Sequence, residues 1–172
     1  MSYFAAALVR ADGSWSAQEV DLDEVEDLEA VADLLRDLAG NGPGPAVLLL
    51  EADDEYVGVV RVDGGAGTLR EPRVFLSDRR AAYTNDRAAL LLEDIDSDDD
   101  DLDLDDDDDD DDEDSGPVVE PAGDPALLDD LGVTAEALLA LCAEEGRLPA
   151  DVLTELCLRT GCHDALERLR EA

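Results

Sequence analysis

The chain has 172 residues and a formal net charge of −36, with 48 acidic residues against 12 basic ones. This charge argues against a general binder of nucleic-acid phosphates and against binding to anionic membranes. No segment approaches the roughly 18 consecutive apolar residues that a membrane span requires. The apolar start also lacks the basic region of a secretory signal, so we expect a cytoplasmic protein.

Half of the net charge lies in one acidic tract, residues 93–114, where 18 of 22 residues are Asp or Glu and none is basic. Such a run cannot bury enough apolar surface to offset its ordering entropy, so we predict that it is disordered. The sequence therefore predicts an α+β domain over residues 1–92, a disordered Asp-rich linker over 93–124 and a small helical domain over 125–172. Every basic residue is Arg, which is typical of a GC-rich genome.

The first predicted elements are two strands and a helix. Residues 3–9 and 15–20 flank an Asp-Gly pair, which is a strong signal for a tight hairpin turn. The following helix is predicted to begin at a capping box formed by Asp23 and Glu26 and to end at Gly40. Its inward face carries apolar residues at helical spacing, namely Val25, Leu28, Val31, Ala32, Leu35 and Leu38.

Three more strands and a helix complete the N-terminal part. The apolar run 46–50 predicts a buried strand, and residues 56–62 are expected to pair with it as a hairpin. Residues 73–76 predict a short fifth strand, and residues 86–92 a closing helix. The order β-β-α-β-β-β-α indicates an α+β fold with a mostly antiparallel five-stranded sheet and helices on one face.

The part after the tract is predicted to be a small helical bundle. Residues 126–131 form a short first helix, and Thr134 caps a second one. Pro149 opens a third helix, which ends at Gly161, and residues 164–169 form a fourth piece.

The C-terminal part contains four residues that could bind a soft metal: Cys142, Cys157, Cys162 and His163. Zinc modules usually present such ligands as close pairs on turns, whereas Cys142 and Cys157 fall on the apolar faces of predicted helices. We therefore expect reduced, buried thiols and no metal site. No catalytic pair or triad is recognisable. The glycine-rich loop at 64–67 joins two strands and lacks a phosphate-binding ending, so no cofactor is predicted.

Five arginines fall within 18 residues that carry a net charge of +2, immediately before the acidic tract. We name this candidate interaction surface the arginine patch, and its members are Arg70, Arg73, Arg79, Arg80 and Arg87. One interpretation is a solvated surface with local ion pairs, each worth little. The other is that the acidic tract folds back over the patch and screens it until a competing ligand arrives.

Several sequence features, spread over most of the globular chain, are similar to those of a known family. They are a Tyr-Phe-Ala-Ala start at residues 3–6, a tryptophan in the second strand at residue 15 and an acidic helix entry at residues 21–28. Two strand sequences, at residues 56–62 and 73–78, and an Asp-Leu-Gly bend at residues 130–132 complete the set. In these features the chain resembles a small bacterial family of tRNA adenosine deaminase-associated proteins. The resemblance implies an association with the tRNA adenosine deaminase, and it assigns no catalytic residue to this chain. Zinc deaminases use H-x-E and P-C-x-x-C motifs, whereas His163 is followed by Asp164 and Ala165.

Three functional hypotheses follow. The leading one is a non-enzymatic accessory protein that binds another protein, with the tRNA adenosine deaminase as the partner that the resemblance implies. The alternative is a general acidic mimic of nucleic acid that competes for basic proteins. A third, an enzyme whose site is assembled only in the fold, is disfavoured by the single histidine and the absence of lysine. The first two require no cofactor, direct nucleic-acid contact or membrane, and all three leave the oligomeric state open.

Overall fold

The computed structural model describes residues 3–40, 44–52, 55–63, 71–93, 121–144 and 146–171. The acidic tract beyond Glu93 and the glycine-rich loop at 64–67 lie outside these residues. The prediction that the tract is disordered therefore stays a prediction.

Six antiparallel strands form one sheet in the order β2-β1-β3-β4-β5-β6, which confirms the α+β class. The strands are β1 (Tyr3–Ala11), β2 (Ser14–Glu19), β3 (Ala46–Ala52), β4 (Tyr56–Val62), β5 (Arg73–Leu76) and β6 (Ala122–Gly123). The β1–β2 turn has positive φ at Asp12 (53°) and Gly13 (78°), the geometry that the Asp-Gly pair predicts. Five of the six strands match those predicted from the sequence.

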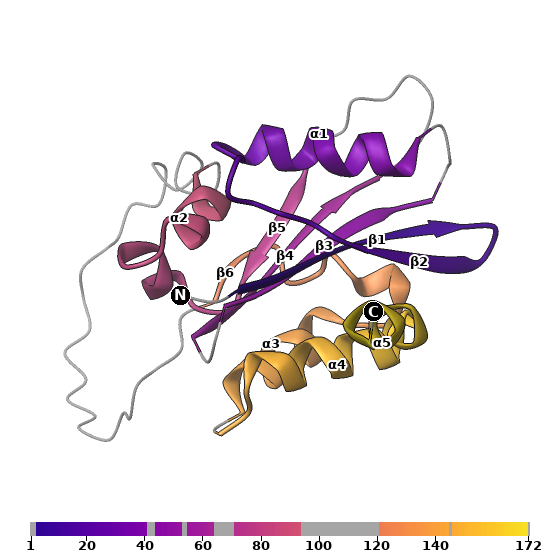
Figure 1. The fold of residues 1–172 in the computed structure, drawn as a ribbon. Coiled ribbons are helices and arrows are strands. Elements are labelled where there is room, and N and C mark those ends of the chain that lie inside the picture. The colour runs from indigo at the N-terminus through magenta and orange to yellow at the C-terminus, as the bar shows by residue number, and fades with distance from the viewer. Residues whose placement is uncertain are drawn as a thin grey trace.

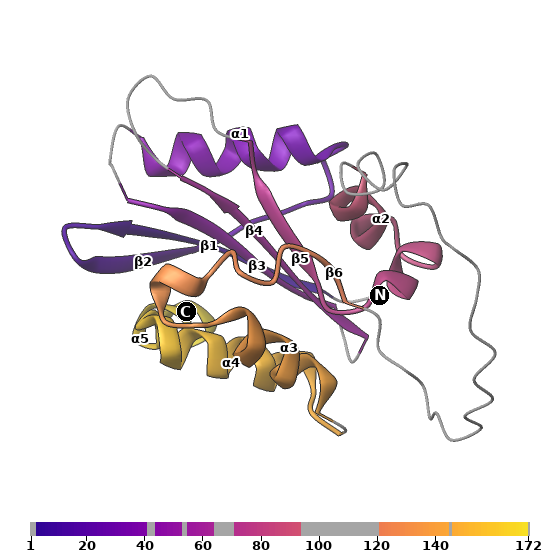
Figure 2. The same cartoon turned by 180° about the vertical axis from the view of Figure 1, so that it is seen from behind.

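Helices cover both faces of this sheet (Figures 1 and 2). Helices α1 (Leu28–Ala39) and α2 (Asp86–Leu92) lie on one face, and the 3₁₀ helix η1 (Arg79–Tyr83) precedes α2. The other face carries the 3₁₀ helix η3 (Asp129–Leu131) and three helices, α3 (Ala135–Ala143), α4 (Pro149–Thr160) and α5 (His163–Glu171). Within the described residues, every helix is too short or too polar to cross a membrane.

Alternate residues of the strands supply two hydrophobic cores. In β1, Ala5 and Ala7 pack with α1 and α2, whereas Ala6 and Leu8 face the C-terminal helices. The same alternation holds in β3, where Leu48 belongs to the first core and Leu49 to the second. A sheet covered on both faces needs apolar side chains on both, and this explains why β3 and β4 are almost continuously apolar.

The chain after the tract belongs to the same sheet and core as the chain before it. Ala122 and Gly123, which were predicted to lie in the linker, pair with Leu76 and Phe75 of β5. Phe75 also packs in one core with residues of η3, α3 and α4. The predicted division at residues 1–92, 93–124 and 125–172 stays a prediction about independent folding.

Two predictions about the helices need correction, and the other helix boundaries follow the predicted signals. The helix predicted over 126–131 is only the 3₁₀ helix η3. Gly40 ends α1, the Thr134 hydroxyl caps α3, and Pro149 and Gly161 bound α4. The predicted capping box at Asp23 is wrong, because the carboxylate that caps α1 is Asp27, which accepts a hydrogen bond from Ala30 N at 2.7 Å.

Candidate functional site

Tyr3 organises the segment that precedes α1. Its hydroxyl donates to Asp21 Oδ1 at 3.0 Å and accepts the Leu22 amide at 2.9 Å. The same Asp21 oxygen accepts the Asp23 amide at 2.8 Å, which makes a side-chain-stabilised turn. This turn fixes residues 21–23 against β1 in a non-helical conformation. The helix therefore begins only at the next available capping carboxylate, Asp27.

Helix α2 is fixed at its start by Asn85. The Asn85 Oδ1 atom accepts the amides of Arg87 at 3.0 Å and Ala88 at 3.3 Å, which satisfies two donors at the helix N-terminus. The same oxygen accepts the hydroxyl of Tyr56 at 3.0 Å. Burial raises the pKa of Tyr56 to about 12, so this hydroxyl stays a donor at neutral pH. The start of α2 is thereby tied to β4.

Arg87 ties α2 to the segment before α1. Its guanidinium carbon lies 3.8 Å from the centre of the Tyr3 ring, and a terminal nitrogen forms an ion pair with Asp23. Burial, the largest single influence, lowers the pKa of Arg87, but the interactions with Asp23 and Tyr3 together outweigh burial and the pKa is raised. Arg87 Nε is buried without a partner. The side chain is thus held by the fold.

Between these two tied segments lies an open hollow of about 470 Å³, which we call the α2 groove. In Figure 1, α2 lies beside the start of α1 on one face of the sheet. The apolar lining combines buried, half-buried and exposed side chains from both walls, and the polar lining is mostly carboxylate. The lining residues are Leu22, Asp23, Val25, Glu26, Asp86, Arg87, Ala89, Leu90 and Glu93.

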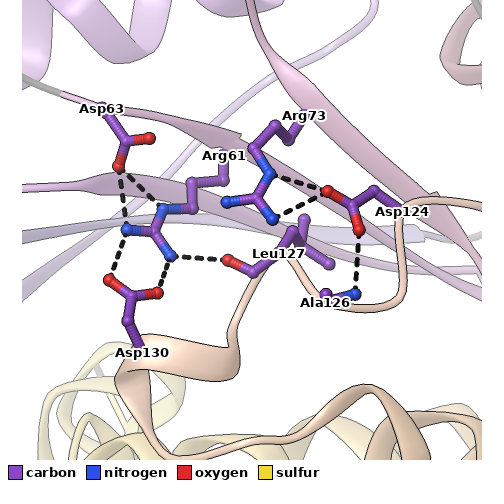
Figure 3. Close-up of polar contacts among 7 residues, drawn as sticks. All are labelled: Arg61, Asp63, Arg73, Asp124, Ala126, Leu127 and Asp130. Atoms are coloured by element: carbon purple, nitrogen blue, oxygen red, sulfur yellow. Dashed lines mark hydrogen bonds and ion pairs between the residues drawn. The ribbon is translucent and has the colours of Figure 1, made fainter.

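The structure divides the arginine patch between the two ends of β5. Arg73 begins β5 and pairs with Asp124 at 2.7 Å, as Figure 3 shows. Arg79 and Arg80 lie in η1, after the end of β5, and Arg80 pairs with Asp78 at 2.8 Å. Arg87 follows in α2, and Arg70 lies outside the described residues. Three of the patch residues thus contact carboxylates of the fold, and a role in binding an anionic ligand stays a proposal.

Sequence reasoning missed Arg61, which is only 5% exposed. Arg61 holds Asp130 through both terminal nitrogens and donates to the Leu127 carbonyl at 2.5 Å, and its terminal nitrogen lies 2.8 Å from Asp63 (Figure 3). The hydrogen bond from Arg61 lowers the pKa of Asp130. These contacts fasten the segment around η3 to β4. One charged residue in the otherwise apolar run 56–62 is the signal that could have indicated Arg61.

Of the four soft ligands considered from the sequence, the side chains of Cys157 and Cys162 contact each other, but no three of the four come together. Burial raises the pKa of the half-buried Cys142 to about 11, while Cys157 and Cys162 are buried. Among the described residues, the group whose ligand atoms lie within 4.8 Å of one another is His163, Asp164 and Glu167, on one turn of α5. The cysteines are not part of this group. Both of its carboxylates are exposed, and exposed acidic groups of this kind are common without a bound ion.

The comparison with protein families gives a match over most of the chain. A family model described as Rv3753c-like tRNA adenosine deaminase-associated protein matches residues 3–163. The match runs from β1 to the first residue of α5, on both sides of the acidic tract, and confirms the resemblance stated from the sequence. Neither the curated proteins nor the solved structures gave a match.

Proposed function

Because the chain belongs to the family of Rv3753c-like tRNA adenosine deaminase-associated proteins, we propose that it is a non-enzymatic cytoplasmic accessory protein that binds a tRNA adenosine deaminase. The family description names an association with the deaminase and does not describe the deaminase itself. The partner surface that we propose is the basic surface through which the deaminase holds tRNA.

The observation that carries this choice of surface is the net charge of −36. A protein that binds tRNA presents clustered positive charge to the phosphate backbone. An acidic protein is attracted to that surface and repelled by the tRNA itself. The chain and the tRNA should therefore compete for the deaminase.

The described side chains support a non-enzymatic role. Cys157 is fully buried, which leaves no room for a substrate at its sulfur. Arg61, Arg73 and Arg87 each pair with carboxylates of the fold. These side chains are committed to holding segments together, as expected of a scaffold that presents a surface.

Gel filtration of the purified chain mixed with the deaminase of the same organism tests this proposal. We expect the two proteins to elute together at low salt and the complex to weaken at physiological salt, since exposed charge pairs are screened over about 10 Å at 0.1 M. Separate elution at low salt, where charge attraction is strongest, would contradict the proposal.

The alternative function is a general acidic mimic of nucleic acid. It is favoured by the charge of the tract alone, where 18 of 22 residues are acidic. A variant in which Gly and Ser replace residues 94–114 at equal length separates the two functions. Our proposal predicts that the variant keeps part of its affinity through the folded residues, whereas the alternative predicts that all binding is lost.

The same variant tests whether the tract screens the arginine patch. We propose that neutralising the tract raises the affinity of the chain for heparin, because the patch is then uncovered. Unchanged heparin affinity would contradict screening and would favour the interpretation of a solvated, ion-paired surface.

A further inference from the structure

We propose that the α2 groove is the docking site for a basic amphipathic segment of a partner protein. The seated segment places an apolar side chain between Val25 and Leu90 and its Lys or Arg side chains against the carboxylates of the rim. The proposal rests on the proposed function only for the identity of the partner, because the geometry and charge of the groove do not depend on which protein binds there.

The floor of the groove suits an apolar side chain. Val25 and Leu90 are half-buried residues that pack against the first core, so each still exposes part of its apolar surface to the groove. Ala89 is exposed on the α2 wall, and its small side chain leaves space there. The volume of about 470 Å³ is in the range of pockets that hold a small ligand, so the groove has room for an apolar side chain. Covering this floor would remove apolar surface from water.

The rim selects for positive charge. Four carboxylates line the groove, those of Asp23, Glu26, Asp86 and Glu93, against one guanidinium, that of Arg87. Arg87 is held by Tyr3 and Asp23 within the fold. The lining therefore has a net charge of −3, and a Lys or Arg side chain of a ligand meets favourable potential at several points of the rim.

The same charge disfavours the other candidate occupants. A second copy of this chain carries a net charge of −36 and is repelled. The chain's own tract joins the groove at Glu93, but its apolar residues are flanked by aspartates and meet like charge. RNA phosphates are repelled for the same reason. A basic protein segment satisfies both the apolar floor and the acidic rim.

The groove is held in shape before anything binds. One wall is fixed by the hydrogen bonds of Tyr3 to Asp21 and Leu22. The other wall is fixed by Asn85 at the start of α2. It is also fixed by Leu91, which packs so closely against β4 that a Cβ added at Gly58 would lie 2.5 Å from Leu91 Cδ1. A preformed groove spares a ligand the cost of ordering it.

The test uses the full ¹⁵N-labelled chain and a synthetic amphipathic peptide made of Leu and Lys. We expect the peptide to shift the amide signals of residues 22–26 and 86–93. Ala89→Glu should weaken binding on the order of tenfold, because the longer side chain fills space on the α2 wall of the groove although it adds a negative charge. Glu26→Arg should weaken binding by a similar factor by removing rim charge.

Two controls keep the result specific. Asp37→Arg makes the same charge change as Glu26→Arg on the last turn of α1, and it should leave peptide affinity within about twofold. The variant with residues 94–114 replaced by Gly and Ser should still show shifts in the groove. Both Ala89 and Glu26 are exposed, and an unchanged thermal midpoint verifies that each variant folds.

The outcomes separate this inference from the proposed function. Shifts confined to other surfaces, or wild-type affinity in both Ala89→Glu and Glu26→Arg, would overturn the groove as the docking site. Peptide binding in the groove together with failure of the deaminase to bind at low salt would support the groove and contradict the proposed partner. Loss of deaminase binding in the groove variants, but not in Asp37→Arg, would support both.

Discussion

Arg61 is the charged residue whose removal should cost the fold most. Its side chain is buried and joins Asp63, Asp130 and the Leu127 carbonyl, which belong to segments on both sides of the acidic tract. Arg61→Met keeps the apolar stem and removes the charge. We expect a loss of about 2–3 kcal/mol in the free energy of unfolding, somewhat below the cost for a fully buried pair because the Asp130 side chain is exposed. Urea denaturation measures the change.

Arg80→Met is the matched control for Arg61→Met. Arg80 also pairs with a carboxylate, that of Asp78, but its side chain is 43% exposed. Exposed pairs contribute about 0–1 kcal/mol, so this variant should unfold close to the wild type. Equal losses in the two variants would show that the contacts of Arg61 do not fasten η3 to the sheet.

The lowered pKa of Asp130 makes its contribution to stability depend on pH. Since the pKa is lower in the folded state, the stabilisation is present above the unfolded pKa and is lost as the pH falls through the folded pKa. Wild type should therefore be more stable than Asp130→Asn at pH 7, and the difference should shrink below about pH 4. A constant difference between the two proteins from pH 7 to pH 3 would contradict the charge pairing.

The partners of these side chains could not be read from the sequence. Arg61 and Asp130 are 69 positions apart, and no local pattern connects them. The arginine patch was defined by neighbourhood in the chain, yet Arg73 finds Asp124 51 positions away. Local spacing indicates where charges gather along the chain but not which carboxylate each one meets after folding.

Element boundaries were predictable where the signal is local. Glycine at the end of α1 and proline at the start of α4 act through their own backbones, so both were predicted correctly. The start of α1 was not, because the turn that delays it depends on Tyr3, 18 residues before Asp21. The same long-range turn shapes one wall of the α2 groove, which is why the groove could not be foreseen.

The turn after η3 packs closely against α4. Gly132 has φ of 108°, and a Cβ there would lie 2.6 Å from the Arg159 carbonyl oxygen. Gly132→Ala should therefore strain the backbone and displace α4. We expect the free energy of unfolding to fall by about 2–4 kcal/mol. Thermal or urea unfolding measures the loss.

Gly161 supplies the comparison for Gly132. Its φ is 89°, but a Cβ there would meet nothing within 4 Å. Gly161→Ala should therefore lower the free energy of unfolding only by the backbone strain at positive φ, about 1 kcal/mol. If both substitutions cost the same, the turn after η3 does not lie against α4 as the structure has it.

At the scale of the molecule, one sheet joins the chain on both sides of the tract. The apolar run 46–50 contained a signal for this arrangement, since a strand apolar on both faces needs two covering layers. The sequence did not indicate which helices cover the second face of the sheet. The apolar face of an amphipathic helix can pack against another helix as well as against a sheet. The C-terminal helices were accordingly interpreted as a bundle.

Cleavage within the tract tests the shared core. In a variant with a protease site inserted after Ser97, we expect the two pieces to stay together in gel filtration. Leu8, Leu49 and Phe75 share a core with Leu128, Leu138 and Leu153, and separation would expose all of them to water. Elution of two separate, folded pieces would instead support the independent domains predicted at 1–92 and 125–172.

Displacement of labelled tRNA from the deaminase by the intact chain tests most directly whether this acidic protein occupies the basic surface of the enzyme. Fluorescence anisotropy at low salt should fall as the chain is added, and the effect should weaken as salt rises. Glu26→Arg should require a higher concentration than Asp37→Arg to displace the same fraction of tRNA. If the chain binds the deaminase and leaves the anisotropy of the bound tRNA unchanged, the chain docks elsewhere on the enzyme and does not compete with tRNA.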